Sequence, residues 1–281
     1  MKFTKMHGTG NDFVVVANMN RQIVLQADQI AALCDRHMGI GADGVILVES
    51  SESCDVFMNY YNSDGSLAQM CGNGVRCLSK FVVDHHIVEG KNFDVETRAG
   101  RIGIEVLGAE GDGPDRFRVD MGDVNFDAAS LPMCYKREKE VIGEVTDFDG
   151  QRYVYGCASM GNPHMVILVD DLGQVPLGRM GAHYESHPMF PEKCNISFAQ
   201  VLDREHIRMD TWERGAGRTL ACGTGTCSSV AVLNRLGKVG SKVEATLSGG
   251  RLTIEVDGTR IHMTGPAVTV FEGDIAMEAL Q

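Results

Sequence analysis

The sequence predicts an α+β fold built from two pseudosymmetric domains that arose by internal duplication. The first observation is a repeat with one nearly constant offset, which is characteristic of a duplicated unit. The second is that each copy holds many short strand-like runs and one central helix-like run. At an offset of 151 residues the segments 10–11, 44–49, 59–62 and 71–74 coincide with 161–162, 195–200, 210–213 and 222–225, and at 150 residues 99–106 coincides with 249–256.

The elements of the first copy follow from local patterns. Apolar and β-branched runs predict strands at 13–17, 45–48 and 56–61. A helix is predicted after the Cys-Gly turn, over about 75–87, because apolar residues recur there at helical spacing. Alternating runs then predict strands at 93–97, 101–106 and 116–121.

The second copy repeats this order. Its predicted helix covers about 226–236, and Gly237 is placed to end it. The predicted strands are 165–169, 196–201, 207–212, 243–247, 251–256 and 260–263. We therefore expect each domain to be a β-sheet or barrel-like layer wrapped around a central helix.

The duplication sets the expected domain boundaries. The N-terminal α+β domain is predicted over 1–130 and the C-terminal α+β domain over 131–281, with the extreme C-terminal segment, about 265–281, allowed to join the first. Pro132 and the acidic stretch near 137–149 are predicted to form the link. The active site is expected in the cleft between the two domains.

Composition excludes several classes of protein. The 281 residues carry 26 Lys and Arg against 38 Asp and Glu, a net charge of −12, which disfavours binding to nucleic acid phosphates. No apolar run approaches the ~20 residues of a membrane span, and the first ten residues show no apolar leader. The nine cysteines form no C-x-x-C pair, so we expect reduced thiols in a cytoplasmic protein and no metal site.

Two cysteines stand out because each opens a helix from a glycine-rich turn. The N–H groups of a first helical turn favour a bound anion and lower the pKa of a thiol there. Cys71 and Cys222 coincide in the repeat, so we expect them on opposite sides of one bound molecule. Inversion of a carbon centre needs two such acid/base groups, one protonated and one deprotonated, and needs no cofactor.

Several motifs resemble those of the diaminopimelate epimerase family. They run in the family's order from near the N-terminus to about residue 270: Met6-His-Gly-Thr-Gly-Asn-Asp-Phe13, Asn62-Ser-Asp-Gly65, Met70-Cys-Gly-Asn-Gly-Val-Arg-Cys77, Gly161-Asn-Pro-His164, Glu213-Arg-Gly215 and Ala221-Cys-Gly-Thr-Gly-Thr226. The resemblance implies a cofactor-independent isomerase that interconverts LL- and meso-diaminopimelate, in lysine and peptidoglycan precursor biosynthesis. It also implies a homodimer.

The resemblance assigns roles to residues at matching positions. Cys71 and Cys222 would be the two catalytic acid/bases. His164 and Glu213 would lie near the thiols and tune their pKa values. The predicted substrate-binding residues are Asn11, Asn62, Gly72, Asn73, Asn162, Asn195, Glu213, Arg214, Gly223 and Thr224. Among them, the planar fork of Arg214 suits a distal carboxylate.

The sequence leaves one departure from the family pattern and two alternative functions open. Many bacterial relatives have Gln where this chain has Gly44, so recognition of the distal end of the substrate must use another group or a water. A related racemase of histidine, proline or hydroxyproline would keep the same cysteine pair with a different distal pocket. A non-catalytic amino-acid-binding or redox-sensing protein would instead show no α-proton exchange under reducing conditions.

Overall fold

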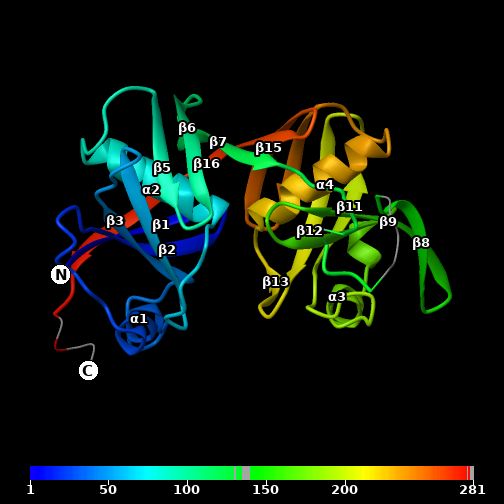
Figure 1. Ribbon diagram of the computed structural model, residues 1–281, viewed down its shortest axis with the longest axis horizontal. Coiled ribbons are helices and arrows are strands. Elements are labelled where there is room, and N and C mark those ends of the chain that lie inside the picture. The colour runs from blue at the N-terminus through cyan, green and yellow to red at the C-terminus, as the bar shows by residue number, and fades with distance from the viewer. Residues whose placement is uncertain (130, 135–139, 277, 279–281) are drawn as a thin grey trace. The chain divides into compact units, whose positions relative to one another are not determined.

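The computed structural model describes residues 1–281 except 130, 135–139, 277 and 279–281 (Figure 1). The chain divides into two compact units. The first is Met1–Asp120 together with Thr264–Gln281, and the second is Met121–Met263. The division falls at Asp120 rather than near residue 130, and the C-terminal segment belongs to the first unit.

The first unit is a sheet with two α-helices. Within it, β2 runs parallel to β3, β3 antiparallel to β4, β4 parallel to β5, and β5 antiparallel to β6, while β17 lies beside β1. Its elements are β1 (Lys2–Gly8), β2 (Asn11–Ala17), α1 (Ala27–Cys34), β3 (Gly44–Glu49), β4 (Val56–Asn62), α2 (Gly72–Asp84), β5 (Asn92–Thr97), β6 (Gly100–Ala109), the part of β7 (Asp115–Asp123) up to Asp120, and β17 (Val268–Asp274).

The second unit repeats this plan. Here β10 is parallel to β11, β11 antiparallel to β12, β12 parallel to β14, and β14 antiparallel to β15. Its elements are β8 (Ile142–Phe148), β9 (Gln151–Ser159), β10 (Pro163–Leu168), η1 (Leu172–Gln174), α3 (Leu177–Glu185), β11 (Asn195–Val201), β12 (His206–Glu213), β13 (Gly217–Thr219), α4 (Gly223–Arg235), β14 (Lys242–Leu247), β15 (Gly250–Asp257) and the part of β16 (Arg260–Pro266) up to Met263.

Strand register confirms the predicted duplication. Phe13 pairs with Gly44 in the first unit, and His164 pairs with Asn195 in the second, which is the same pairing displaced by 151 residues. Later in each unit the displacement is 150 residues, as the sequence also indicated. Thr97 pairs with Gly100 in the first unit, and Leu247 pairs with Gly250 in the second. The two units therefore share one topology.

Each unit has a buried central helix, as predicted. Helix α2 lies among the strands of its unit and α4 among those of the other (Figure 1). Most of their residues are buried, including the whole first turn of α2. Small residues permit this close packing, since a Cβ added to Gly74 would lie 2.9 Å from the methyl group of Met58. Gly237, with φ of 70°, ends α4 as expected.

Several elements were not predicted. The segment assigned to the link contains β8, which pairs with β9 along its length, while 137–139 lie outside the described residues. Helix α3 was missed because glycines interrupt its apolar pattern. Gly181 is required there, since a Cβ would lie 2.6 Å from the Trp212 ring. Within the described residues, no helix is both long and apolar enough to cross a membrane.

Candidate active site

Cys71 and Cys222 are the N-cap residues of the two central helices. Both have extended backbone, with φ of −140° and −120°, and the helix begins at the next residue. The first intrahelical bonds run from Val75 N to Cys71 O at 2.8 Å and from Thr226 N to Cys222 O at 2.9 Å. The N–H groups of 72–74 and 223–225 therefore precede the helical ladder, where an anion is favoured.

The predicted asparagines stand at matching strand ends of the two units. In the first, β2 begins at Asn11, β3 at Gly44, and β4 ends at Asn62. Because β2 and β3 are parallel and β4 is antiparallel, these three ends meet at one edge of the sheet. In the second unit, the corresponding edge carries Asn162, Asn195 and Glu213.

A tight turn places Asn11 beside the helix. Thr9 and Gly10 both have positive φ, 53° and 85°, and join β1 to β2 as a two-residue hairpin loop. Asn11 is thus the first strand residue and not part of the turn. Gly8 approaches the helix so closely that an added Cβ would lie 3.0 Å from the carbonyl oxygen of Asn73.

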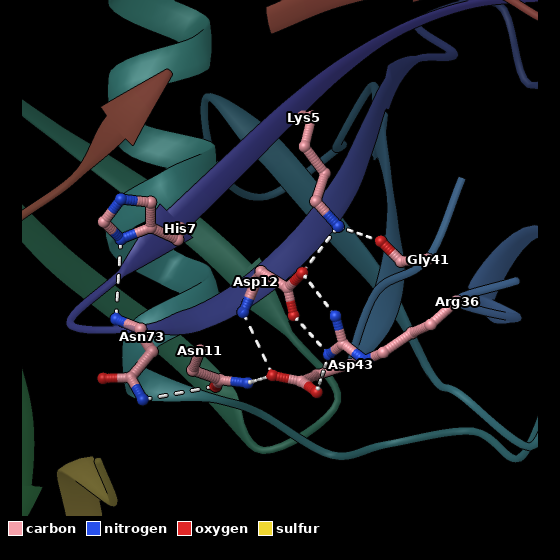
Figure 2. Close-up of polar contacts among 9 residues, drawn as sticks. Lys5, His7, Asn11, Asp12, Arg36, Gly41, Asp43 and Asn73 are labelled. Carbon is pink, nitrogen blue, oxygen red and sulfur yellow. Dashed lines mark hydrogen bonds and ion pairs between the residues drawn. The ribbon is translucent and has the colours of Figure 1, made fainter. Parts of the chain in front are cut away.

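In the first unit, Cys71, Asn11 and Asn73 are in contact. The sulfur of Cys71 lies 3.5 Å from Asn11 Oδ1, and Asn73 Nδ2 donates to the same oxygen at 3.2 Å. Asn11 Nδ2 donates to Asp43 Oδ2 at 2.7 Å (Figure 2). Asn62 instead donates to Ser66 Oγ at 3.0 Å within its own turn.

In the second unit, the sulfur of Cys222 is held by groups of the first turn of α4. It accepts the N–H of Gly225 at 3.4 Å and lies 3.5 Å from Thr224 Oγ1. Burial raises the pKa of Cys222 well above its usual range, and the negative charge of Glu213 raises it further. The bonds from Thr224 and Gly225 act in the opposite direction.

His164 contacts Thr224 in the first turn of α4 and is fully buried. Its Nε2 is 3.1 Å from Thr224 Oγ1 and 3.1 Å from Asn162 Oδ1. Burial, reinforced by the positive charge of Arg214, lowers the pKa of His164 to about 3. The ring is therefore neutral near pH 7. Thr224 Oγ1 connects it to the sulfur of Cys222.

In the second unit, Asn195 links the start of β10 to the residue that follows β12. Its Nδ2 donates to the Pro163 carbonyl at 3.0 Å, and its Oδ1 accepts the backbone N–H of Arg214 at 2.9 Å. The exposed Arg214 side chain donates to the Glu192 carbonyl at 3.1 Å. Glu213 accepts from Thr219 Oγ1 at 2.6 Å.

The departure at Gly44 has a local structural reason. A Cβ at this position would lie 2.5 Å from the Tyr61 carbonyl oxygen and 2.7 Å from the Tyr60 ring. The buried Tyr60 ring also packs edge-on against Phe13 at 5.8 Å. An aromatic ring therefore fills the space into which a side chain at residue 44 would extend.

Several polar residues beside the site were missed by the sequence analysis. Arg76, fully buried in α2, donates to Asn73 Oδ1 at 3.0 Å and to the Gly72 carbonyl at 3.2 Å. Asp43 was not considered, although it lies two residues before the predicted strand 45–48 and directly before the observed β3. The signal available for Arg76 was its charge, since it lies within the apolar pattern that predicts the helix.

Within the described residues, no three His, Cys, Asp or Glu side chains are grouped as metal ligands would be.

Comparisons with known proteins agree over nearly the whole chain. A family model described as "Diaminopimelate epimerase" matches residues 3–126 and 156–270. The diaminopimelate epimerase of Leptospira biflexa is 41% identical over 276 residues, covering 98% of this chain and 99% of that protein. That of Stutzerimonas stutzeri is 42% identical over 282 residues, covering 99% of each.

A solved structure shows the same fold at much lower identity. A hydroxyproline epimerase from Agrobacterium vitis aligns with a TM-score of 0.68 and 15% identity, covering 98% of this chain and 90% of that one. This likeness concerns the fold alone. The family model and the full-length relatives together show that this chain belongs to the diaminopimelate epimerase family, whose members are isomerases.

Proposed function

We propose that this protein interconverts LL- and meso-2,6-diaminopimelate by two-base proton transfer at the α-carbon. The observation that carries the proposal is that two cysteines cap equivalent buried helices in duplicated units. The named relatives support the substrate, since both are diaminopimelate epimerases that match along nearly the whole chain.

The reaction is balanced by the two thiols alone. One thiolate takes the α-proton and becomes a thiol, while the other thiol gives its proton to the opposite face of the carbon and becomes a thiolate. Cys71 and Cys222 fill these roles, and the direction of the reaction decides which begins as the thiolate. The proposal requires both sulfurs to reach one bound substrate.

The helix starts stabilise the charge that develops during proton removal. Gly72 and Asn73 on one helix, with Gly223 and Thr224 on the other, present backbone N–H groups to the α-carboxylate. Helix N-termini carry about half a positive charge each, so they favour the enolate-like intermediate. Asn11, Asn62, Asn162, Asn195, Glu213 and Arg214 hold the remaining groups of the substrate, while His164 and Glu213 tune Cys222.

We also propose that the protein is a cytoplasmic homodimer that acts in lysine and peptidoglycan precursor biosynthesis. Nine free thiols support a reducing compartment. Exposed apolar side chains of the first unit support self-association, with Val270 and Phe271 on β17 at 54% and 47% exposure. Light scattering of wild type and Phe271→Glu tests this, and a monomeric wild type would contradict it.

The function is tested by turnover of purified, reduced protein on single stereoisomers. LL-diaminopimelate should give the meso form, and proline, hydroxyproline and histidine should not be racemised. Turnover of one of those amino acids, with none of diaminopimelate, would favour the related racemase. No α-proton exchange with any of them under reducing conditions would favour a binding or sensing role.

A further inference from the structure

The orientation of Asn11 beside Cys71 is fixed by a carboxylate. An amide has a donating and an accepting end, and its partners decide which end faces which group. Asp43 is one such partner because an ionised carboxylate only accepts. The end of Asn11 that lies 2.7 Å from Asp43 Oδ2 must therefore be the NH₂ group. The carbonyl oxygen of Asn11 then faces Cys71. The same oxygen accepts from Asn73 (Figure 2).

A second, independent contact requires the same orientation from the other end. Arg76 is a donor only, so the atom of Asn73 at 3.0 Å from its guanidinium must be Oδ1. The NH₂ group of Asn73 then points to Asn11 Oδ1 at 3.2 Å. The chain of hydrogen bonds thus runs in one direction, from Arg76 through Asn73 and Asn11 to Asp43.

Asp43 is itself held in place by a charged cluster, defined here as Lys5, Asp12, Arg36 and Asp43. Arg36 contacts Asp43 at 2.7 Å and Asp12 at 2.8 Å, and Lys5 contacts Asp12 at 2.6 Å. The backbone N–H of Asp12 also donates to Asp43 at 3.1 Å. Although burial raises the pKa of Asp12, the bonds from Arg36 and Lys5 hold it well below its usual range. The cluster therefore keeps Asp12 ionised and holds Asp43 in place through Arg36 and the backbone of Asp12.

We propose that Asp43 is a positioning residue that holds the carbonyl oxygen of Asn11 toward Cys71, so that Cys71 keeps its proton in the ligand-free enzyme. The 3.5 Å contact between the Cys71 sulfur and Asn11 Oδ1 is a hydrogen bond only when the sulfur carries hydrogen. A thiolate there would face an oxygen lone pair instead. This inference rests on the proposed function only for its effect on catalysis, because the protonation of Cys71 in the ligand-free enzyme is measurable without turnover.

The second unit lacks this anchor at the corresponding position. At the offset of 151, Asp43 corresponds to Cys194, whose thiol donates to the Asn195 carbonyl at 3.3 Å. Asn162, the counterpart of Asn11, lies with Oδ1 against His164. The sulfur of Cys222 accepts a backbone N–H, which stabilises a thiolate. The duplicated sites thus differ in the group that fixes the amide beside the cysteine.

The test is the pH dependence of Cys71 alkylation by iodoacetamide, followed by mass spectrometry of the peptide containing this residue. Asp43→Asn replaces the carboxylate by an amide that can also donate, so Asn11 can turn its NH₂ group to the sulfur. We expect Cys71 in this variant to react about three- to tenfold faster at a fixed pH below its midpoint, which corresponds to a downward shift of about half to one pH unit.

A double-variant cycle separates orientation from loss of charge. The charged groups of this network are the four of the cluster and Arg76 on α2, and the titratable His7 on β1 accepts the N–H of Gly10 next to Asn11. In an Asn11→Ala background, Asp43→Asn should leave the Cys71 profile within about twofold, because the amide through which it acts is gone. The same increase in both backgrounds would overturn the inference in favour of charge removal alone.

Failure of the inference is distinguishable from failure of the proposed function. An unchanged Cys71 profile in Asp43→Asn, with diaminopimelate turnover by wild type intact, overturns the positioning role and leaves the function standing. Asp43→Ser, whose hydroxyl can also donate, gives the same comparison if Asp43→Asn does not fold. Thermal unfolding of each variant establishes that the protein measured is folded.

Discussion

The backbone N–H of Gly225 donates to the sulfur of Cys222 at 3.4 Å, and a Cβ added to Gly225 would lie 3.2 Å from that sulfur. The corresponding Gly74 does not crowd Cys71 in this way, because its added Cβ would be 3.5 Å from the Cys71 Cβ and nearest to the flexible end of Met58. The two helix starts therefore differ in how closely the third residue of the helix approaches the N-cap cysteine.

This difference predicts unequal effects of two matched substitutions. Gly225→Ala should lower kcat at least about tenfold, because the methyl group displaces the sulfur and because catalysis depends strongly on the position of the reacting group. Gly74→Ala is the matched control and should cost less than about threefold, since Met58 can move. Steady-state kinetics of both variants checks this, and equal losses would contradict the asymmetry.

Substitution of either cysteine by serine should reduce epimerisation at least about a thousandfold, since a hydroxyl is a far weaker acid than a thiol and each direction uses both groups. The polarimetric or coupled assay of LL-diaminopimelate measures it. Cys77→Ser and Cys227→Ser, which change buried thiols within the same helices, are suitable controls for folding. Near-normal turnover in Cys71→Ser or Cys222→Ser would refute the assignment.

Arg214→Lys should raise KM about tenfold with a smaller change in kcat. Lysine keeps the charge but loses the planar fork that pairs with a carboxylate, and each charge-assisted bond is worth about 1.5–3 kcal/mol. The backbone bond to Asn195 does not depend on the side chain, so the local fold should persist. A variant with unchanged KM would show that the guanidinium does not bind the substrate.

The buried His164 predicts acid sensitivity of folding. Its pKa is about 3 in the folded protein, below its ordinary value, so the unfolded state binds more protons as the pH falls. This depressed pKa contributes stability that is present above about pH 6.5 and is lost at about 1.4 kcal/mol per pH unit down to pH 3. Denaturant unfolding at several pH values measures it. His164→Gln should flatten the slope between pH 6.5 and 4, and an unaltered slope would contradict it.

The sequence could predict the features that depend on local pattern. The repeat, the two central helices and the cysteines at their starts are visible in short motifs and in apolar spacing, and Gly72 and Gly223 lie where the turns required them. Strand β8 was harder to recognise, because its partly buried face includes Glu144 and its exposed face includes Val145, and it is a strand through its pairing with β9.

Features made by distant residues could not be predicted in this way. Asp43 reaches Asn11 across 32 positions, and Arg76 reaches Thr9 across 67. Neither pairing leaves a periodic signal, since each depends on how a strand end or turn meets the start of a helix. The space at Gly44 was likewise filled by Tyr60, sixteen residues away on the neighbouring strand, which only the fold reveals.

The most direct test of the two-thiol account is the early course of the reaction in deuterated water with LL-diaminopimelate. If one thiolate removes the proton and the other thiol supplies a solvent-derived deuteron, the meso product should carry deuterium at the inverted centre while the recovered substrate remains protiated. Deuterium appearing in the recovered substrate as fast as in the product would indicate a single exchanging base. That result would contradict the paired roles of Cys71 and Cys222.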